Sequence, residues 1–219
     1  VRCDVCPRRC ALHEGQRGAC FVRQRLDDRM VLTTYGRSSG FCIDPVEKKP
    51  FFHAYPGALA YSFGMLGCDL HCSYCQNWVT SQALRDPAAV APPLDVTPAR
   101  LARQAVDLGA KLLVSTYNEP LITSEWAVDV FKEARAAGLV TGLVSNGNAT
   151  PRALDYLRPW IDLFKVDLKS FDDRRFSTKN STPSEWPSPS LESGNRISRT
   201  SKVSPMLARD TVGKSLATG

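Results

Sequence analysis

From residue 58 to residue 168 the sequence alternates short apolar runs with segments of helical pattern. The apolar runs cover residues 58–66, 111–117, 139–145 and 161–168. Between them, Thr97 and Thr150 each stand directly before a proline, the pattern of a helix N-cap, and Gly109 and Gly138 fit helix ends. Strands that alternate with helices predict βαβ units, and therefore a parallel sheet with right-handed crossovers.

Each of these predicted strands is followed by a group of polar residues. The groups are residues 67–76, 116–120, 145–148 and 167–169. Each group alone is weak evidence, because polar residues are common at strand ends. Parallel strands of a barrel, however, share one mouth at their carboxyl ends, where the chemistry of such folds gathers. The four groups together therefore predict a functional site at that mouth.

The first polar group contains the spacing C-x3-C-x2-C, formed by Cys68, Cys72 and Cys75. Three thiolates on one tight loop can hold three irons of a [4Fe–4S] cluster and leave the fourth iron open to a substrate or cofactor. A zinc ion is the alternative, with His71 as a possible fourth ligand. His71 is adjacent to Cys72, so its side chain is expected to point away from the thiols.

A second cysteine group lies at the start of the chain, with Cys42 standing alone between the two groups. Its members are Cys3, Cys6, Cys10 and Cys20. Four thiols in this spacing suit either a structural zinc site or a second iron–sulfur cluster, and free thiols are a third reading. The crowding of all eight cysteines into the first 75 residues favours metal binding over disulfides, and hence a reducing cytoplasm. We expect Cys42 to be a buried core residue and residues 47–49 to form a solvated turn.

Composition divides the chain into three parts. Residues 1–57 form a Cys-rich N-terminal segment, irregular over residues 31–57, and residues 58–176 form the α/β core. Residues 177–219 are about one third Ser and Thr with no sustained period, which predicts a disordered tail. No apolar run reaches the roughly 18 residues that span a bilayer, so no membrane is expected. The net charge is +6, but the basic residues form only isolated pairs, so no nucleic-acid partner is expected either.

These motifs resemble those of the radical SAM superfamily, whose C-x3-C-x2-C loop follows the first strand of a partial barrel. More closely, they are similar to the AmmeMemoRadiSam-system radical SAM enzymes, relatives of the pyruvate formate-lyase activating enzyme. The residues that carry the resemblance are 3–10, 15–20, 35–37, 43–50, 62–64, 68–78, 116–120, 145–147 and 166–169.

The resemblance implies a role for each motif of the predicted mouth. Cys68, Cys72 and Cys75 would bind the [4Fe–4S] cluster, whose open iron would chelate the amino and carboxylate groups of S-adenosylmethionine. Tyr74 would lie beside the adenine. Asn118 and Glu119 take the place of a Gly-Gly-Glu-Pro segment that meets the methionine amino group. The positions that would contact the ribose and the methionine carboxylate are Ser145, Asn146, Asp167 and Lys169.

The activity implied is reductive cleavage of S-adenosylmethionine to a 5′-deoxyadenosyl radical, which abstracts a hydrogen atom. A low-potential donor such as flavodoxin or ferredoxin would supply the electron, and a partner protein is a candidate substrate. The alternatives are an inactive shortened copy and a zinc-binding structural protein. A radical SAM barrel has about six strands, so the four predicted here indicate an incomplete partial barrel. The abrupt change of composition after Phe176 predicts a truncated or frameshifted product with residues missing at both ends.

Overall fold

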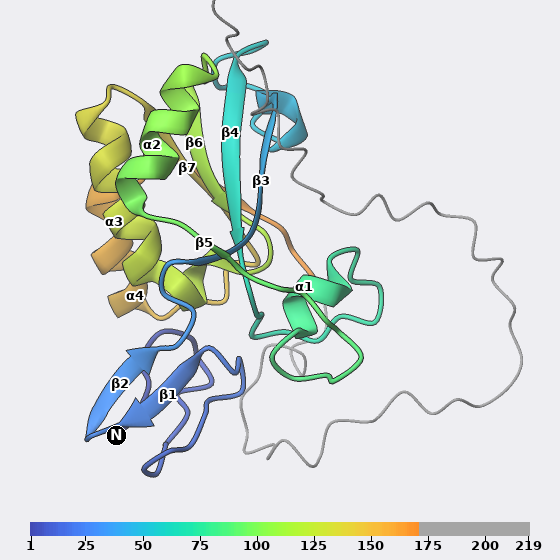
Figure 1. Ribbon diagram of the computed structural model, residues 1–219, viewed down its shortest axis with the longest axis vertical. Coiled ribbons are helices and arrows are strands. Elements are labelled where there is room, and N and C mark those ends of the chain that lie inside the picture. The colour runs from blue at the N-terminus through green and yellow to red at the C-terminus, as the bar shows by residue number, and fades with distance from the viewer. Residues whose placement is uncertain (171–219) are drawn as a thin grey trace, which may run out of the picture.

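The computed structural model describes residues 1–170, and a six-stranded sheet lies at its centre (Figure 1). The strands of this sheet are β3 (Arg37–Pro45), β4 (Leu59–Met65), β5 (Leu94–Asp95), β6 (Leu112–Thr116), β7 (Val140–Ser145) and β8 (Leu163–Val166). The helices are α1 (Trp78–Gln82), α2 (Pro98–Asp107), α3 (Ser124–Ala136) and α4 (Pro151–Leu157), with 3-10 turns η1 (Val46–Lys48), η2 (Pro120–Thr123) and η3 (Arg158–Trp160). A separate hairpin near the N-terminus pairs β1 (Arg23–Leu26) with β2 (Arg29–Leu32).

The strand order is β5-β3-β4-β6-β7-β8, and the four strands from β4 to β8 in this order are parallel. Helices α2, α3 and α4 connect them and lie on one side of the sheet (Figure 1). The predicted class, an α/β fold with a partial parallel barrel, is confirmed. Strand β3 runs antiparallel to β4, and the short β5 runs antiparallel to β3.

Local capping explains why the predicted helices begin where they do. The hydroxyl of Thr97 accepts a hydrogen bond from the Arg100 amide at 3.3 Å, and that of Thr150 accepts one from the Ala153 amide at 3.2 Å. Each bond satisfies an amide that has no partner within its own helix. The four apolar runs all form strands, each shorter than predicted by one to four residues.

The prediction that residues 31–57 are irregular is wrong. Strand β3 occupies Arg37–Pro45 and, with nine residues, is the longest strand described. The pairing of β3 with β4 shifts register between Ser38 and Gly40, and the Ser38 hydroxyl donates to the Gly64 carbonyl at 2.7 Å. Strand formation here depends on pairing with β4, which no local pattern in β3 reveals.

The two faces of the sheet are covered differently. The helical face packs Phe63, Leu113 and Leu143 against Trp126 and Phe131 of α3. The opposite face carries a small cluster, in which Val46 and Phe51 cover Ala60, Val114 and Val144. In this cluster the covering side chains come from the segment that follows β3.

No helix within residues 1–170 is both long enough and apolar enough to cross a bilayer. The predicted disordered tail, residues 177–219, lies outside the described residues, as does the end of the predicted core, residues 171–176.

Candidate functional site

The cysteine loop leaves the carboxyl end of β4 and leads into α1. None of Cys68, Cys72 and Cys75 forms a disulfide, and each is partly buried. The Cys68 sulfur accepts from the Leu70 amide at 3.4 Å, and the Cys75 amide donates to the Cys72 carbonyl at 3.1 Å in a tight turn. Burial raises the pKa of the Cys68 thiol well above its usual value, and the nearby carboxylates of Asp69 and Glu119 raise it further.

Asp69 anchors this loop to the end of β7. Its side chain is completely buried, and its two carboxylate oxygens accept from the Asn146 amide group at 2.8 Å and the Asn148 amide group at 2.6 Å. A buried carboxylate needs such donors, because an unpaired charge away from water is costly. The residue next to Cys68 therefore fixes the position of the loop relative to β7.

Glu119 joins the ends of β6 and β7. It accepts from the Ser145 hydroxyl at 2.7 Å, the Asn146 backbone amide at 2.8 Å and the Leu121 amide at 3.0 Å. Burial, together with the nearby Asp69 carboxylate, raises the pKa of Glu119 to about 8. Glu119, Ser145 and Asn146 thus lie together, as expected from the parallel topology. They hydrogen-bond to one another, and both carboxylate oxygens of Glu119 already accept from donors of the protein.

The remaining predicted residues lie around the same mouth. Asn118 donates to the Met65 carbonyl at 2.7 Å and accepts from Thr80 at 2.9 Å, so it ties β4 to α1. The exposed Tyr74 donates from its hydroxyl to the Lys169 carbonyl, across the mouth. The Lys169 ammonium lies 3.1 Å from the Asp167 carboxylate, after β8. The cysteine loop therefore reaches from the end of β4 to the residues that follow β8.

The donor set of the loop fits an iron–sulfur cluster in its chemistry. Thiolates are the soft ligands that select zinc or iron–sulfur clusters, and the three thiols lie on one loop without disulfides. Within residues 1–170, no three His, Cys, Asp or Glu side chains are already gathered around a point as metal ligands. Cluster binding would therefore require the three thiols to turn toward a common point.

Several residues of the mouth were not among the predicted site residues. Asp69 and Asn148 hold the loop against β7, and Thr80 holds Asn118. Arg85 donates from one guanidinium nitrogen to the carbonyls of both Cys68, at 3.2 Å, and Ala19. The sequence gives no local signal for these contacts, because each joins segments that are distant along the chain.

A buried ionic cluster lies at the end of η1, where a solvated turn was expected. Lys49 is only 2% exposed, and its ammonium lies 2.8 Å from the Asp44 carboxylate and 3.1 Å from the Tyr117 hydroxyl. The Cys42 thiol donates to Asp44 at 2.9 Å, so Cys42 is a half-buried, hydrogen-bonded residue rather than a core residue. Burial opposes ionisation of Asp44, but the hydrogen bonds from Cys42, Lys49 and Lys48 outweigh it and lower its pKa to about 2.

We expect the Lys49→Met variant to lose about 3 kcal/mol of unfolding free energy, because it leaves a partly buried carboxylate without its buried cation. The Lys48→Met variant is the matched control, since Lys48 contacts the same carboxylate from a side chain that is 69% exposed, and it should lose less than about 1 kcal/mol. Urea unfolding measures both. Equal losses in the two variants would show that burial of Lys49 is not what matters.

The stability that Asp44 supplies also depends on pH. Its pKa is lower in the folded chain than in the unfolded chain, so this contribution is complete above about pH 4 and is lost as the pH falls toward 2. The loss of stability over this acid range should be smaller in Lys49→Met than in the unmodified chain.

The fold and this mouth define a class of protein: a partial parallel α/β barrel with a three-cysteine loop after its first parallel strand. Comparison with known proteins agrees with this. The model of the radical SAM superfamily matches residues 64–199. An uncharacterized protein of Methanocaldococcus jannaschii is 34% identical over 173 residues, which cover 79% of this chain and 50% of that protein. The chain belongs to the radical SAM superfamily, and it spans about half the length of this relative.

Proposed function

We propose that the chain uses a [4Fe–4S] cluster, held by Cys68, Cys72 and Cys75, to cleave S-adenosylmethionine reductively. The observation that carries this proposal is the link between the cysteine loop and the ends of β6 and β7. Asp69, directly after Cys68, bonds the same Asn146 whose backbone amide bonds Glu119. This link supports the proposal, because in a member of the radical SAM superfamily the cosubstrate would bind at the strand ends to which the cysteine loop is held.

When bound, the cluster supplies one electron to S-adenosylmethionine, whose S–C5′ bond breaks to give methionine and a 5′-deoxyadenosyl radical that abstracts a hydrogen atom. The residues of the chain bind and orient the cosubstrate. The half-exposed Lys169 ammonium suits a carboxylate partner, and the exposed Tyr74 ring offers a flat surface to the adenine. Ser145, Asn146 and Asp167 would contact the ribose and the methionine carboxylate, and Asn118 the methionine amino group.

Glu119 has a different part in this proposal from the one that its motif implies. Because donors of β7 and η2 already satisfy its carboxylate, we assign it to holding the ends of β6 and β7 together. Its contribution to cosubstrate binding is then made through the Ser145 and Asn146 positions. Glu119 is thus a positioning residue in this proposal.

We also propose the finer assignment to the AmmeMemoRadiSam group and its activating-enzyme relatives. The support is the motif of residues 43–50, which the structure builds into the buried Asp44–Lys49–Tyr117 contact. On this reading the radical would be installed on a partner protein. A low-potential flavodoxin or ferredoxin of the cytoplasm would donate the electron.

Anaerobic reconstitution with iron and sulfide tests the proposal. We expect a brown protein that, once reduced with dithionite, converts S-adenosylmethionine to 5′-deoxyadenosine, measured by liquid chromatography and mass spectrometry. A colourless protein that holds only zinc would contradict cluster binding. An intact cluster without 5′-deoxyadenosine would contradict the enzymatic part and favour an inactive copy.

A further inference from the structure

The N-terminal segment before β3 has almost no apolar core of its own. Among residues 1–36, the buried apolar side chains are Cys3, Cys6, Leu12, Cys20 and Val22, and three of these five are cysteines. None of the cysteines forms a disulfide. A segment of about 40 residues or fewer usually needs a metal, disulfides or a partner to hold one structure.

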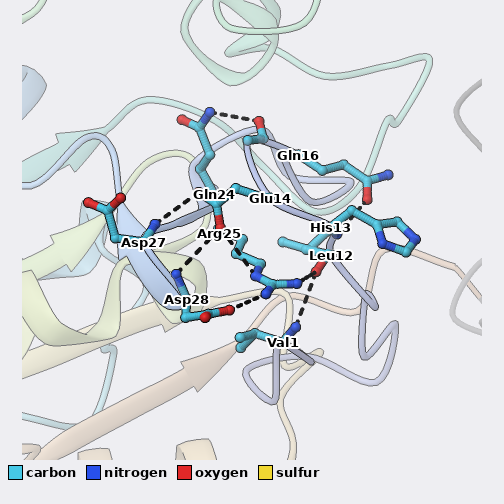
Figure 2. A network of polar contacts seen from close by, with 10 residues as sticks. Val1, Leu12, His13, Glu14, Gln16, Gln24, Arg25, Asp27 and Asp28 are labelled. Carbon is cyan, nitrogen blue, oxygen red and sulfur yellow. Dashed lines mark hydrogen bonds and ion pairs between the residues drawn. The ribbon is translucent and has the colours of Figure 1, made fainter.

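Polar contacts on the outside of this segment do not replace a core. Figure 2 shows the network that joins the loop of residues 12–16 to the β1–β2 hairpin, centred on Arg25. Arg25 donates to the Leu12 carbonyl at 3.2 Å and forms ion pairs with Glu14 and Asp28, whose side chains are 56% and 82% exposed. Exposed ion pairs of this kind contribute little each, so this network alone does not account for the order of the segment.

Two tight turns present the cysteines to one another. In the first, the Arg9 amide donates to the Cys6 carbonyl at 3.1 Å, and the Cys3 amide donates to the Cys10 carbonyl at 2.9 Å. In the second, Phe21 donates to the Gly18 carbonyl at 2.8 Å, with Cys20 inside the turn. The turns face each other, because the Cys10 sulfur lies 3.7 Å from where a Gly18 side chain would begin.

Both turns use backbone conformations that their residues rarely adopt. Arg9, next to Cys10, has φ +44°, and Phe21, next to Cys20, has φ +62°. Left-handed backbone at such residues costs on the order of 1 kcal/mol or more each and persists only where the surroundings impose it. A network of bonds through the neighbouring residues Cys10 and Cys20 would impose these left-handed conformations.

We propose that Cys3, Cys6, Cys10 and Cys20 form a structural zinc site with four thiolate ligands. The spacings C-x2-C and C-x3-C match those of zinc ligand pairs, and a closed four-cysteine site is the kind that holds small segments folded. Binding would release the four thiol protons and turn the sulfurs inward, since they are not yet gathered in the described structure. The product, one Zn²⁺ with four thiolates, carries a net charge of −2.

The surroundings suit this charge. The guanidinium of Arg23, on the residue that follows Val22, is 3% exposed, and Glu125 balances part of its charge through contacts of 2.6 and 2.5 Å. Arg85 contacts the Ala19 carbonyl, one residue before Cys20. One buried and one half-buried cation thus stand beside the proposed site.

The site would also support the cysteine loop of the mouth. Gly67, just before Cys68, has no room for a side chain, because an added carbon would lie 2.5 Å from Val22 and 3.1 Å from the Cys20 carbonyl. Arg85 bonds the carbonyls of Ala19 and Cys68 at once. The zinc-bound segment would therefore pack directly against the loop that carries Cys68 and support its position.

The test uses the full chain with Cys68, Cys72 and Cys75 all replaced by alanine, so that its outcome does not depend on the proposed function. Metal analysis of this variant should find about one zinc per chain. Adding the Cys10→Ser change, at the least buried of the four ligands, should abolish stoichiometric zinc, whereas adding Cys42→Ser instead should leave it unchanged.

Cobalt gives a second reading should the Cys10→Ser protein fail to fold. After removal of zinc by a chelator, Co²⁺ added to the triple-alanine variant should produce the strong visible absorption of a tetrahedral thiolate site. Folded triple-alanine protein without stoichiometric zinc, or without that absorption, would overturn the proposal. Iron and sulfide bound at these four cysteines in place of zinc would overturn it equally.

Discussion

The Cys72→Ala variant should bind no stable [4Fe–4S] cluster and should form 5′-deoxyadenosine only at the level of a sample without protein. Cys72 lies in the middle of the C-x3-C-x2-C loop, and three thiolates are the fewest that can hold the cluster while leaving one iron open. With two, the cluster has no fixed position beside the strand ends. Iron and sulfide content, the visible spectrum and the product assay measure the loss.

The matched control for this prediction is Cys42→Ala. Cys42 is also a partly buried cysteine without a disulfide, but it lies on β3 and bonds Asp44, not the loop. It should bind as much iron as the unmodified chain. A Cys72→Ala protein that keeps its iron and its activity would show that Cys72 is not a cluster ligand.

The elements that the sequence predicted well are those determined by neighbouring residues. Thr97 and Thr150 accept hydrogen bonds from amides three residues later, so their role as helix N-caps can be predicted from a short stretch of sequence. The convergence of Glu119 with Ser145 was also predictable, because parallel strands bring their carboxyl ends to one edge. This convergence followed from the parallel topology and could not be predicted from local sequence pattern alone.

The elements that the sequence did not predict depend on partners far along the chain. Strand β3 is ordered by β4, and Lys49 looked like a surface residue because its neighbours are Lys48 and a proline. Its burial follows from Tyr117, which lies 68 residues away. The anchoring role of Asp69 was not predicted for the same reason, because the asparagines that donate to it follow β7, far along the chain. Such pairings are not visible in one sequence.

The variant Asp69→Ala is expected to lose about 3–5 kcal/mol of unfolding free energy. It removes two hydrogen bonds to a charged acceptor, each worth about 1.5–3 kcal/mol, and it leaves the buried amides of Asn146 and Asn148 without that partner. Urea unfolding followed by circular dichroism measures the change.

Two further variants separate the hydrogen bonds from other effects of the substitution. Asp69→Asn keeps one acceptor oxygen and the volume of the side chain, so its loss should be roughly half as large. Asp107→Ala removes a carboxylate from an exposed position at the end of α2 and should change stability by less than about 0.5 kcal/mol. If Asp69→Ala were as stable as Asp107→Ala, the contacts to β7 would not be what holds the loop.

The same series connects stability with cluster binding. Asp69 is not among the proposed cluster ligands or cosubstrate contacts, and its two hydrogen bonds hold the cysteine loop to the end of β7, so we expect it to affect iron content through the position of the loop. We expect iron content after reconstitution to fall in the order unmodified chain, Asp69→Asn, Asp69→Ala, in parallel with the stability of the three proteins. A stable Asp69→Asn protein that binds as much iron as the unmodified chain would show that one acceptor oxygen is enough to anchor the loop. That oxygen can still accept a hydrogen bond from one of the two asparagines.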